Sequence, residues 1–140
     1  MRFVLDNSVA TRWLFGDGRA QALDYAKRVL DLLTQEDGLA VVPCTWAPQA
    51  GNVIVRAEAK GLLQEARSAE FIGILQEMAI ETDPGSHLHA LDGVTQLARR
   101  YGLSTYDAAY LELALREGLP LATNDETLRK ALAKAGGRLA

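Results

Sequence analysis

The chain contains few of the residues on which several common classes of site depend. Cys44 is the only cysteine among 140 residues, which excludes a disulfide framework and any zinc site built from several cysteines. No apolar run approaches the roughly 20 residues that a membrane span requires. With 15 Lys and Arg against 18 Asp and Glu, the net charge of −3 gives no overall basic excess for nucleic-acid binding, and only a local basic patch stays open.

The start of the chain also lacks the pattern of a signal peptide, because Asp6 interrupts the apolar run that begins at Phe3. We therefore expect a cytoplasmic protein. The hydrophobic share of 49% is that of an ordinary globular protein, and this length suits one folding unit. We expect a single domain that spans residues 1–140.

Short apolar runs alternate with segments that have helical spacing of apolar residues. The runs at 3–5, 39–43, 79–82 and 119–123 predict strands, and a helix is expected after the first of them. Further helices are predicted at 20–35, from Pro48 to beyond Gly61, and at 65–78, 88–101, 104–115 and 125–135. Strands separated by helices indicate a parallel sheet with helices on both faces, an α/β sandwich.

Three aspartates are placed where such a sheet would bring them together. Asp6 follows the first strand, Asp125 follows the last, and Asp107 lies in the first turn of a helix. Ligand sites form beyond the carboxyl ends of parallel strands. Two carboxylates about 5 Å apart repel by roughly 3 kcal/mol at an effective dielectric near 20, so either one is protonated or a cation holds them together. Mg²⁺ and Mn²⁺, which take oxygen ligands, suit such a site.

Each aspartate also has a local explanation. Asp6, Asn7 or Ser8 could cap the helix that follows. Asp107 stands three residues after Ser104, the spacing of a capping box. Asp125 suits the start of a helix in the same way. The spacing of these residues therefore leaves both interpretations open.

The three aspartates lie in three longer segments: Val4-Leu5-Asp6-Asn7-Ser8, the stretch from Leu103 to Ala114 that contains Ser104-Thr105-Tyr106-Asp107-Ala108, and Leu121-Ala122-Thr123-Asn124-Asp125-Glu126-Thr127-Leu128. These segments resemble the PIN domain, and within it the VapC-type ribonuclease toxins of prokaryotic type II toxin–antitoxin pairs. The resemblance implies a PIN-like three-layer sandwich whose short, mainly parallel sheet is flanked by helices. It also implies an endoribonuclease, dependent on Mg²⁺ or Mn²⁺, that hydrolyses RNA with metal-activated water, with Asp6, Asp107 and Asp125 as catalytic residues and metal ligands.

The sequence departs from the family pattern at one position. The family usually has a Glu three residues before an Asn on the helix after the second strand, whereas Gln49 precedes Asn52 here. An amide oxygen can still face a metal or a ligated water, but it carries no charge and accepts no proton at neutral pH. We expect weaker metal binding, with one well-held ion rather than two. Candidates for contacts with the carboxylates or the substrate, each of which could instead be a cap or turn residue, are Ser8, Gln49, Asn52, Thr123 and Asn124.

The resemblance further implies partners. These are an RNA substrate, an antitoxin whose tail occupies a groove and covers the acidic site, and a second copy of the chain in a homodimer, with DNA bound only through the antitoxin. Two other classes of function stay open for this sequence. One is a PIN-like module that binds RNA or a partner and whose catalysis is weakened or lost because of Gln49. The other comprises phosphotransfer receivers and aspartyl phosphatases, which Ser8 and Thr123-Asn124 disfavour because those positions would hold an acid and a lysine.

Overall fold

The computed structural model describes residues 1–140, and its centre is a four-stranded parallel sheet in the order β3-β2-β1-β4. β1 (Arg2–Leu5) lies between β2 (Leu39–Val42) and β4 (Leu121–Ala122), and β3 (Ile80–Thr82) forms the edge beside β2. In this register Phe3 faces Ala40, and Val4 faces both Val41 and Leu121. The short apolar runs are buried on both faces, as a central parallel strand requires.

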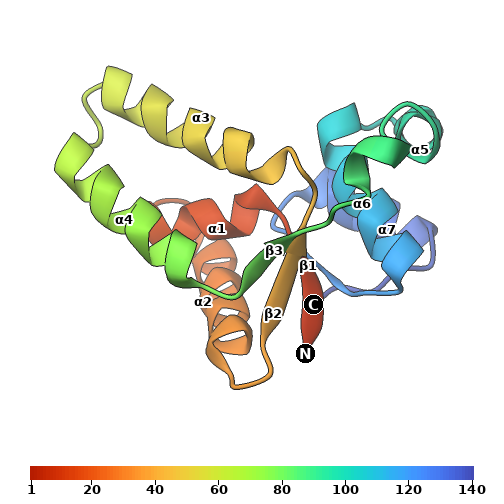
Figure 1. Ribbon diagram of the computed structural model, residues 1–140, viewed down its shortest axis with the longest axis horizontal. Helices are drawn as coiled ribbons and strands as arrows, with labels where there is room; N and C mark the ends of the chain where they lie inside the picture. Colours follow the sequence, from red (N-terminus) through yellow and green to blue (C-terminus); the bar gives the residue numbers. More distant parts are fainter.

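Helices cover both sides of the sheet (Figure 1), which confirms the predicted α/β sandwich. α1 and α2 lie on one side, α6 and α7 on the other, and α3 and α4 extend outward as a pair. The helices are α1 (Asn7–Leu14), α2 (Ala20–Thr34), α3 (Trp46–Ala59), α4 (Glu65–Glu77), α5 (Gly93–Tyr101), α6 (Thr105–Glu117) and α7 (Glu126–Lys134), with a 3₁₀ turn η1 (Ser86–His89). None of these helices combines the length and apolar character that crossing a membrane would need.

The hydrophobic core lies between the sheet and the helices that cover it. Fully buried side chains come from β1, from α6 and from α7, among them Phe3, Leu5, Leu111, Leu113 and Leu128. This packing fixes how α6 and α7 begin relative to the end of β1. The residues at those three points are therefore held in place by the core.

Three element boundaries differ from the sequence-based prediction. The predicted helix 88–101 is divided into η1 and α5, with a break at Asp92 (φ −121°, ψ −101°). Leu88 and Leu91 are exposed, so no burial of the apolar stripe holds that first turn in an α-helix. α3 begins at Trp46 and ends at Ala59, before Gly61 with φ +72°.

The predicted last strand, 119–123, shortens to two residues in β4. Pro120 has no N–H to give to a ladder, and the N–H of Leu119 is already donated to the carbonyl of Ala114 at the end of α6. The adjoining residue, Thr123, uses its side chain for contacts described below. These competing bonds restrict regular pairing to Leu121 and Ala122.

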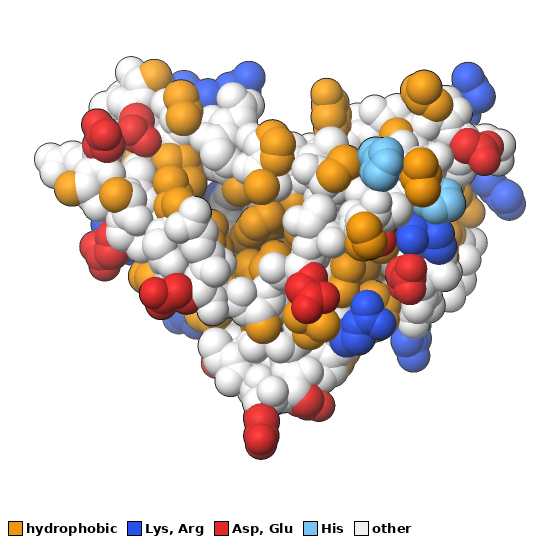
Figure 2. Space-filling view, in the orientation of Figure 1, with side chains coloured by type: hydrophobic (Ala, Val, Ile, Leu, Met, Phe, Trp, Pro, Cys, Tyr) orange, Lys and Arg blue, Asp and Glu red, His pale blue; other side chains and the backbone are white.

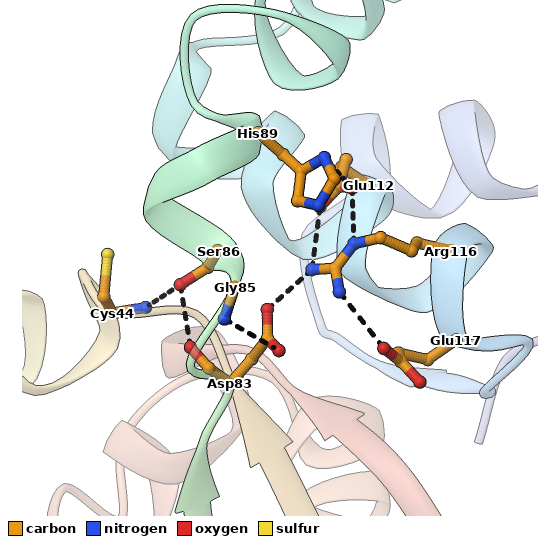
Figure 3. A network of polar contacts seen from close by, with 8 residues as sticks. All are labelled: Cys44, Asp83, Gly85, Ser86, His89, Glu112, Arg116 and Glu117. Carbon is orange, nitrogen blue, oxygen red and sulfur yellow. Dashed lines mark hydrogen bonds and ion pairs between the residues drawn. The ribbon is translucent and has the colours of Figure 1, made fainter.

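A partly buried ionic network joins η1 and the end of β3 to α6 (Figure 3). The guanidinium of Arg116 contacts Asp83 at 2.6 Å and Glu112 at 2.7 Å. Both carboxylates are less than one tenth exposed. The hydroxyl of Ser86 donates to the carbonyl of Asp83 and accepts from the backbone N–H of Cys44. The network thus connects the segment before α3 with the segment that carries Asp107.

Candidate active site

Asp6 directly follows β1 and is buried, with 5% of its surface exposed. Two hydroxyl groups donate to the same carboxylate oxygen, Oδ2: that of Ser8 at 2.6 Å and that of Thr123 at 2.7 Å. Desolvation raises the pKa of Asp6 above its ordinary value, and the two hydroxyls and the neighbouring carboxylates modify that effect in opposite directions. The side chain makes no cap of α1, so the capping explanation does not account for its position.

Ser8 and Thr123 connect Asp6 to the segment after β4. The Ser8 hydroxyl accepts from the backbone N–H of Asn124 at 2.9 Å, and the Thr123 hydroxyl accepts from that of Asp125 at 3.0 Å. Each hydroxyl has one proton, and both protons point to Asp6. The 3.2 Å contact between the two hydroxyls is therefore a contact between acceptors, and the carboxylate holds the pair together.

Asp107 lies in the first turn of α6. The hydroxyl of Ser104 accepts from the backbone N–H of Asp107 at 3.1 Å, which is half of the predicted capping box. Partial burial and the charge of Asp125 raise the pKa of Asp107, and the Ser104 hydroxyl offsets part of that rise. The carboxylate thus lies beside a second negative charge.

Asp125 is the N-cap of α7, because its Oδ1 accepts from the backbone N–H of Leu128 at 2.9 Å. The capping explanation is therefore correct for this residue. The cap uses only Oδ1 of Asp125, and Oδ2 makes no hydrogen bond within the protein. Cap and site are compatible functions of the same side chain.

All three aspartates line one open pocket of about 310 Å³ at the carboxyl edge of the sheet. No Lys or Arg lines it, so no protein cation balances the negative charge. Its full lining is Asp6, Asn7, Ser8, Gln49, Val53, Asp107, Tyr110 and Asp125. The sequence-based expectation that these carboxylates share one edge of the sheet agrees with this geometry.

Opposite the aspartates, Gln49 belongs to a second hydrogen-bond cluster. The hydroxyl of Tyr110 donates to Oε1 of Gln49 at 2.6 Å. Nδ2 of Asn7 lies 3.1 Å from the Trp46 carbonyl and 3.4 Å from both Gln49 Oε1 and the Tyr110 hydroxyl. Burial and the charge of Asp6 raise the pKa of Tyr110 well above its usual range, so its hydroxyl remains a donor at neutral pH.

The donor chemistry of the pocket fits a hydrated divalent cation. The side chains do not form a closed cage, since no three His, Cys, Asp or Glu groups lie close enough to hold one ion. Mg²⁺ usually keeps several waters and binds through one or two carboxylates. A cation would stabilise the ionised carboxylates of Asp6 and Asp107, whose pKa is raised by burial and, to a smaller extent, by neighbouring carboxylates.

Other predicted residues lie outside the pocket. Asn52 is exposed on α3 and does not line it. Asn124 lies behind it, where its amide donates to the carbonyls of Ser8 and Ala22 and joins the end of β4 to α1 and α2. Asn7 and Tyr110, which the sequence analysis did not single out, do line it. A signal was present for Tyr110, which lies one helical turn after Asp107 on the same face.

Comparisons with known proteins agree with this architecture. A family model described as "PIN domain" matches residues 3–133. Among curated protein sequences none matches the chain. Solved structures are also similar in fold, and three crystal structures among them are described next. Each shares less than a quarter of its residues with this chain, so each bears on the fold alone.

PAE2754 from Pyrobaculum aerophilum is 24% identical, with a TM-score of 0.65 over 99% of this chain and 91% of that one. VapBC2 from Rickettsia felis, bound to a DNA fragment from their promoter, is 13% identical, with a TM-score of 0.67 over 100% and 98%. FitAcB from Neisseria gonorrhoeae is 17% identical, with a TM-score of 0.60 over 99% and 96%. Because the family model covers nearly the whole sequence, the chain belongs to the PIN domain family.

Proposed function

We propose that this chain is an endoribonuclease dependent on Mg²⁺ or Mn²⁺ and the toxin of a toxin–antitoxin pair. The pocket at the sheet edge carries the proposal. Asp6, Asp107 and Asp125 meet there without a balancing protein cation. Burial first, and then the charge of the neighbouring aspartates, raises the pKa of Asp6 and Asp107. Membership of the PIN family supports nuclease chemistry at this position.

Each aspartate has a distinct role in this proposal. Asp6 and Asp107 hold the cation, and Asp125 orients a water of the hydrated ion with the oxygen that is not capping α7, because the three carboxylates do not lie close enough to hold one ion directly. When bound, a divalent ion lowers the pKa of a water ligand and offsets negative charge on a phosphate. The hydroxyls of Ser8 and Thr123 fix the Asp6 carboxylate by occupying Oδ2, which leaves Oδ1 to face the pocket.

RNA is held by cations outside the pocket. Arg12 and Arg19 already pair with Asp17 and Glu126. Exposed basic side chains without an ion pair are better candidates, and they lie toward the ends of α3 and α5: Arg56, Lys60, Arg99 and Arg100. Trp46 is buried, and the indole N–H of Trp13 donates to the Ala26 carbonyl, so neither is assigned to base stacking.

The protein partner we propose is an antitoxin. An apolar groove of about 310 Å³ lies between α3, α4 and the neighbouring strands, with Trp46, Ile54, Ile72 and Leu75 in its wall. Figure 2 shows apolar side chains in the hollow between the two lobes of the molecule. The groove suits an apolar antitoxin segment. Similarity to VapBC2 supports the pairing, with DNA bound through the antitoxin and the toxin as a homodimer.

Cleavage of a panel of labelled RNAs by antitoxin-free protein tests the proposed activity. We expect cleavage with Mg²⁺ or Mn²⁺ and none with EDTA. Asp6→Asn and Asp107→Asn should each lower the rate by about 100-fold or more, since several kcal/mol of charge stabilisation is lost. Asp31→Asn, a change at an exposed site on α2, should leave the rate unchanged. Cleavage that persists in Asp6→Asn would contradict the proposal.

A second function is favoured by one observation. Gln49 stands where the family has an acid, and its oxygen is already engaged by Tyr110. The pocket thus carries fewer charges than is usual for the family. If wild-type protein binds RNA but cleaves it with neither ion, the chain is a PIN-like module that binds RNA or a partner.

A further inference from the structure

We propose that Gln49 is a hydrogen-bond donor to a phosphate of the bound RNA and not a metal ligand. This inference deepens the proposed function and rests on it, because it assigns a substrate contact within the same pocket. It concerns which end of the Gln49 amide faces the ligand. The hydrogen bonds around that amide decide the question.

The oxygen of the amide is directed away from any ligand. Oε1 of Gln49 accepts from the Tyr110 hydroxyl at 2.6 Å and lies 3.4 Å from the amide nitrogen of Asn7. A carbonyl oxygen has two lone pairs, and these two donors together can occupy them. An oxygen already bound in this way is a poor ligand for a cation.

The surrounding bonds also fix which atom is the oxygen. The amide of Asn7 is oriented by the Trp46 carbonyl, which can only accept, so its nitrogen faces Gln49 and Tyr110. If the Gln49 amide were turned over, its nitrogen would face the Tyr110 hydroxyl as a donor. The buried hydroxyl proton would then meet donors only and would lack an acceptor. The orientation with Oε1 toward Tyr110 gives the hydroxyl proton of Tyr110 an acceptor, whereas Oδ1 of Asn7 is buried without a partner.

The nitrogen of the amide remains for the pocket. Nε2 of Gln49 makes no hydrogen bond within the protein, and it is not among the buried atoms that lack a partner, so solvent reaches it. Gln49 lines the pocket with the three aspartates. A neutral donor repels a metal ion but attracts an anionic oxygen. Nε2 of Gln49 can therefore bind a phosphate oxygen that the neighbouring carboxylates of the pocket would repel.

Three variants separate the two possible roles of Gln49. Gln49→Met keeps the length of the side chain but removes donor and acceptor. Gln49→Glu keeps the acceptor toward Tyr110 and replaces the donor with a charged oxygen. Tyr110→Phe removes the hydroxyl that holds the amide. Gln35→Met, at the exposed end of α2, is the matched control.

We measure cleavage of a labelled single-stranded RNA of mixed sequence and the affinity of the free protein for Mn²⁺ by calorimetry. In Gln49→Met we expect KM to rise about tenfold, because one charge-assisted hydrogen bond to the substrate is lost. The kcat and the Mn²⁺ affinity should stay unchanged. Gln49→Glu should raise KM and bind Mn²⁺ more tightly. Tyr110→Phe should raise KM in the wild-type background and have no such effect in Gln49→Met.

Two outcomes would overturn the inference. Weaker Mn²⁺ binding in Gln49→Met would show that the amide oxygen serves the metal, and an unchanged KM would show that the amide does not contact substrate. If wild-type protein does not cleave, the same RNA is followed by fluorescence anisotropy with Mn²⁺ present. Tenfold weaker binding by Gln49→Met then supports the inference although the proposed activity has failed, whereas equal binding, or no binding by wild-type protein, overturns it.

Discussion

At Asp6 the fold places a carboxylate in a position that opposes its ionisation. The residue is buried at the end of β1, and negative neighbours face it. Two hydroxyl donors lower its pKa again, but desolvation is the larger effect. The protein therefore loses stability whenever Asp6 ionises without a cation nearby.

This arrangement predicts how stability depends on pH. Because the pKa of Asp6 and Asp107 is raised in the folded state above 3.8, the folded state binds more protons than the unfolded state just above that pH. The contribution of these residues to the free energy of unfolding should fall as pH rises from about 3.8 through their raised pKa values. Urea unfolding of wild-type and Asp6→Asn protein across this range, without metal, checks it.

Asp6→Asn should lose less stability as pH rises than wild-type protein does. Asp37 provides a contrast of opposite sign, because the N-terminal amino group lowers its pKa. Its contribution to the free energy of unfolding is lost as pH falls. In Asp37→Asn the free energy of unfolding should therefore rise less with increasing pH than it does in wild-type protein. Parallel pH profiles for wild-type and Asp6→Asn protein would contradict the account of the site.

Thr123 provides a second test at the scale of one residue. Its fully buried hydroxyl donates to Asp6 and accepts from the backbone N–H of Asp125. Thr123→Val has nearly the same shape without the hydroxyl and should lower the free energy of unfolding by about 2 kcal/mol. Mn²⁺ affinity should fall as well, because the Asp6 carboxylate loses one of the groups that orient it.

Thr123→Ser is the control, since it retains the hydroxyl and loses only a methyl group. It should keep Mn²⁺ affinity close to that of wild-type protein. If the serine and valine variants bind Mn²⁺ equally, the hydroxyl has no role in orienting Asp6. Calorimetry on both variants makes this comparison.

Much of the site could be predicted at this scale, and a part could not. Asp6, Asp107 and Asp125 follow from their places after strands and at helix starts. Asn7 and Tyr110 contact Gln49 from positions 42 and 61 residues away in the sequence, and no local pattern connects them. The family pattern indicated Asn52 together with Gln49, but Asn52 is exposed on α3 and does not line the pocket.

Among the elements, the segment that leads into η1 is held by polar contacts of Asp83 and Ser86, whereas Leu88 within η1 is exposed. Arg116 on α6 lies between Asp83 and Glu112, both buried, and His89 of η1 lies 3.7 Å from Glu112. Figure 3 shows these side chains converging on the guanidinium. Removing Arg116 would leave the two buried carboxylates without the guanidinium that balances their charge.

Arg116→Met should therefore lower the free energy of unfolding by about 3 kcal/mol, in the range observed when one partner of a buried ion pair is removed. Arg67→Met removes an exposed pair with Glu70 and should cost less than about 1 kcal/mol. Urea unfolding of both proteins at neutral pH measures the difference. Equal effects would mean that the network contributes no more than an exposed pair.

Two glycines should respond in opposite ways to the same substitution. A Cβ at Gly38, between α2 and β2, would lie 2.6 Å from the carbonyl oxygen of Leu33, so Gly38→Ala should destabilise the chain by at least about 1 kcal/mol. A Cβ at Gly73 inside α4 would meet nothing within 4 Å. Gly73→Ala should stabilise by about 0.5–1 kcal/mol. Thermal unfolding of both variants checks the two signs.

Element boundaries were predictable where burial and capping agree. The start of α6 follows from Ser104 and its end from Gly118, which has φ +65°. The division between η1 and α5 was not predictable, because Leu88 and Leu91 fit a helical stripe but remain exposed. The contacts of Ser86 and Asp83 with distant segments determine the backbone there.

For the whole molecule, a cation at the acidic pocket should stabilise the fold. A ligand that binds only the folded state at 100 times its Kd adds about 2.7 kcal/mol. Mn²⁺ should therefore raise Tm at neutral pH, and EDTA should reverse the rise. The rise should shrink as pH falls, since protons compete for the same carboxylates. Asp107→Asn should show a smaller rise at every pH, and an identical rise would place the ion elsewhere.

The three-layer arrangement itself was predictable because apolar runs and amphipathic helices alternate along the chain. Strand order was not, since β1 pairs with strands from both halves of the sequence. The match between Val4, Val41 and Leu121 depends on packing in three dimensions. The periodicity predicted an α/β sandwich, and only the resemblance of particular segments to the PIN domain predicted the family.

The three aspartates are not equally bound to the architecture. Asp125 closes the first turn of α7, and Asp6 joins two hydroxyl groups from distant segments. The Asp107 carboxylate holds no helix end and no neighbouring element. When selection for the reaction is lost, replacement of Asp107 should therefore change the stability of the fold little, whereas replacement of Asp6 or Asp125 should lower it. In relatives that have lost the nuclease activity, we therefore expect Asp107 to be replaced before Asp6 or Asp125.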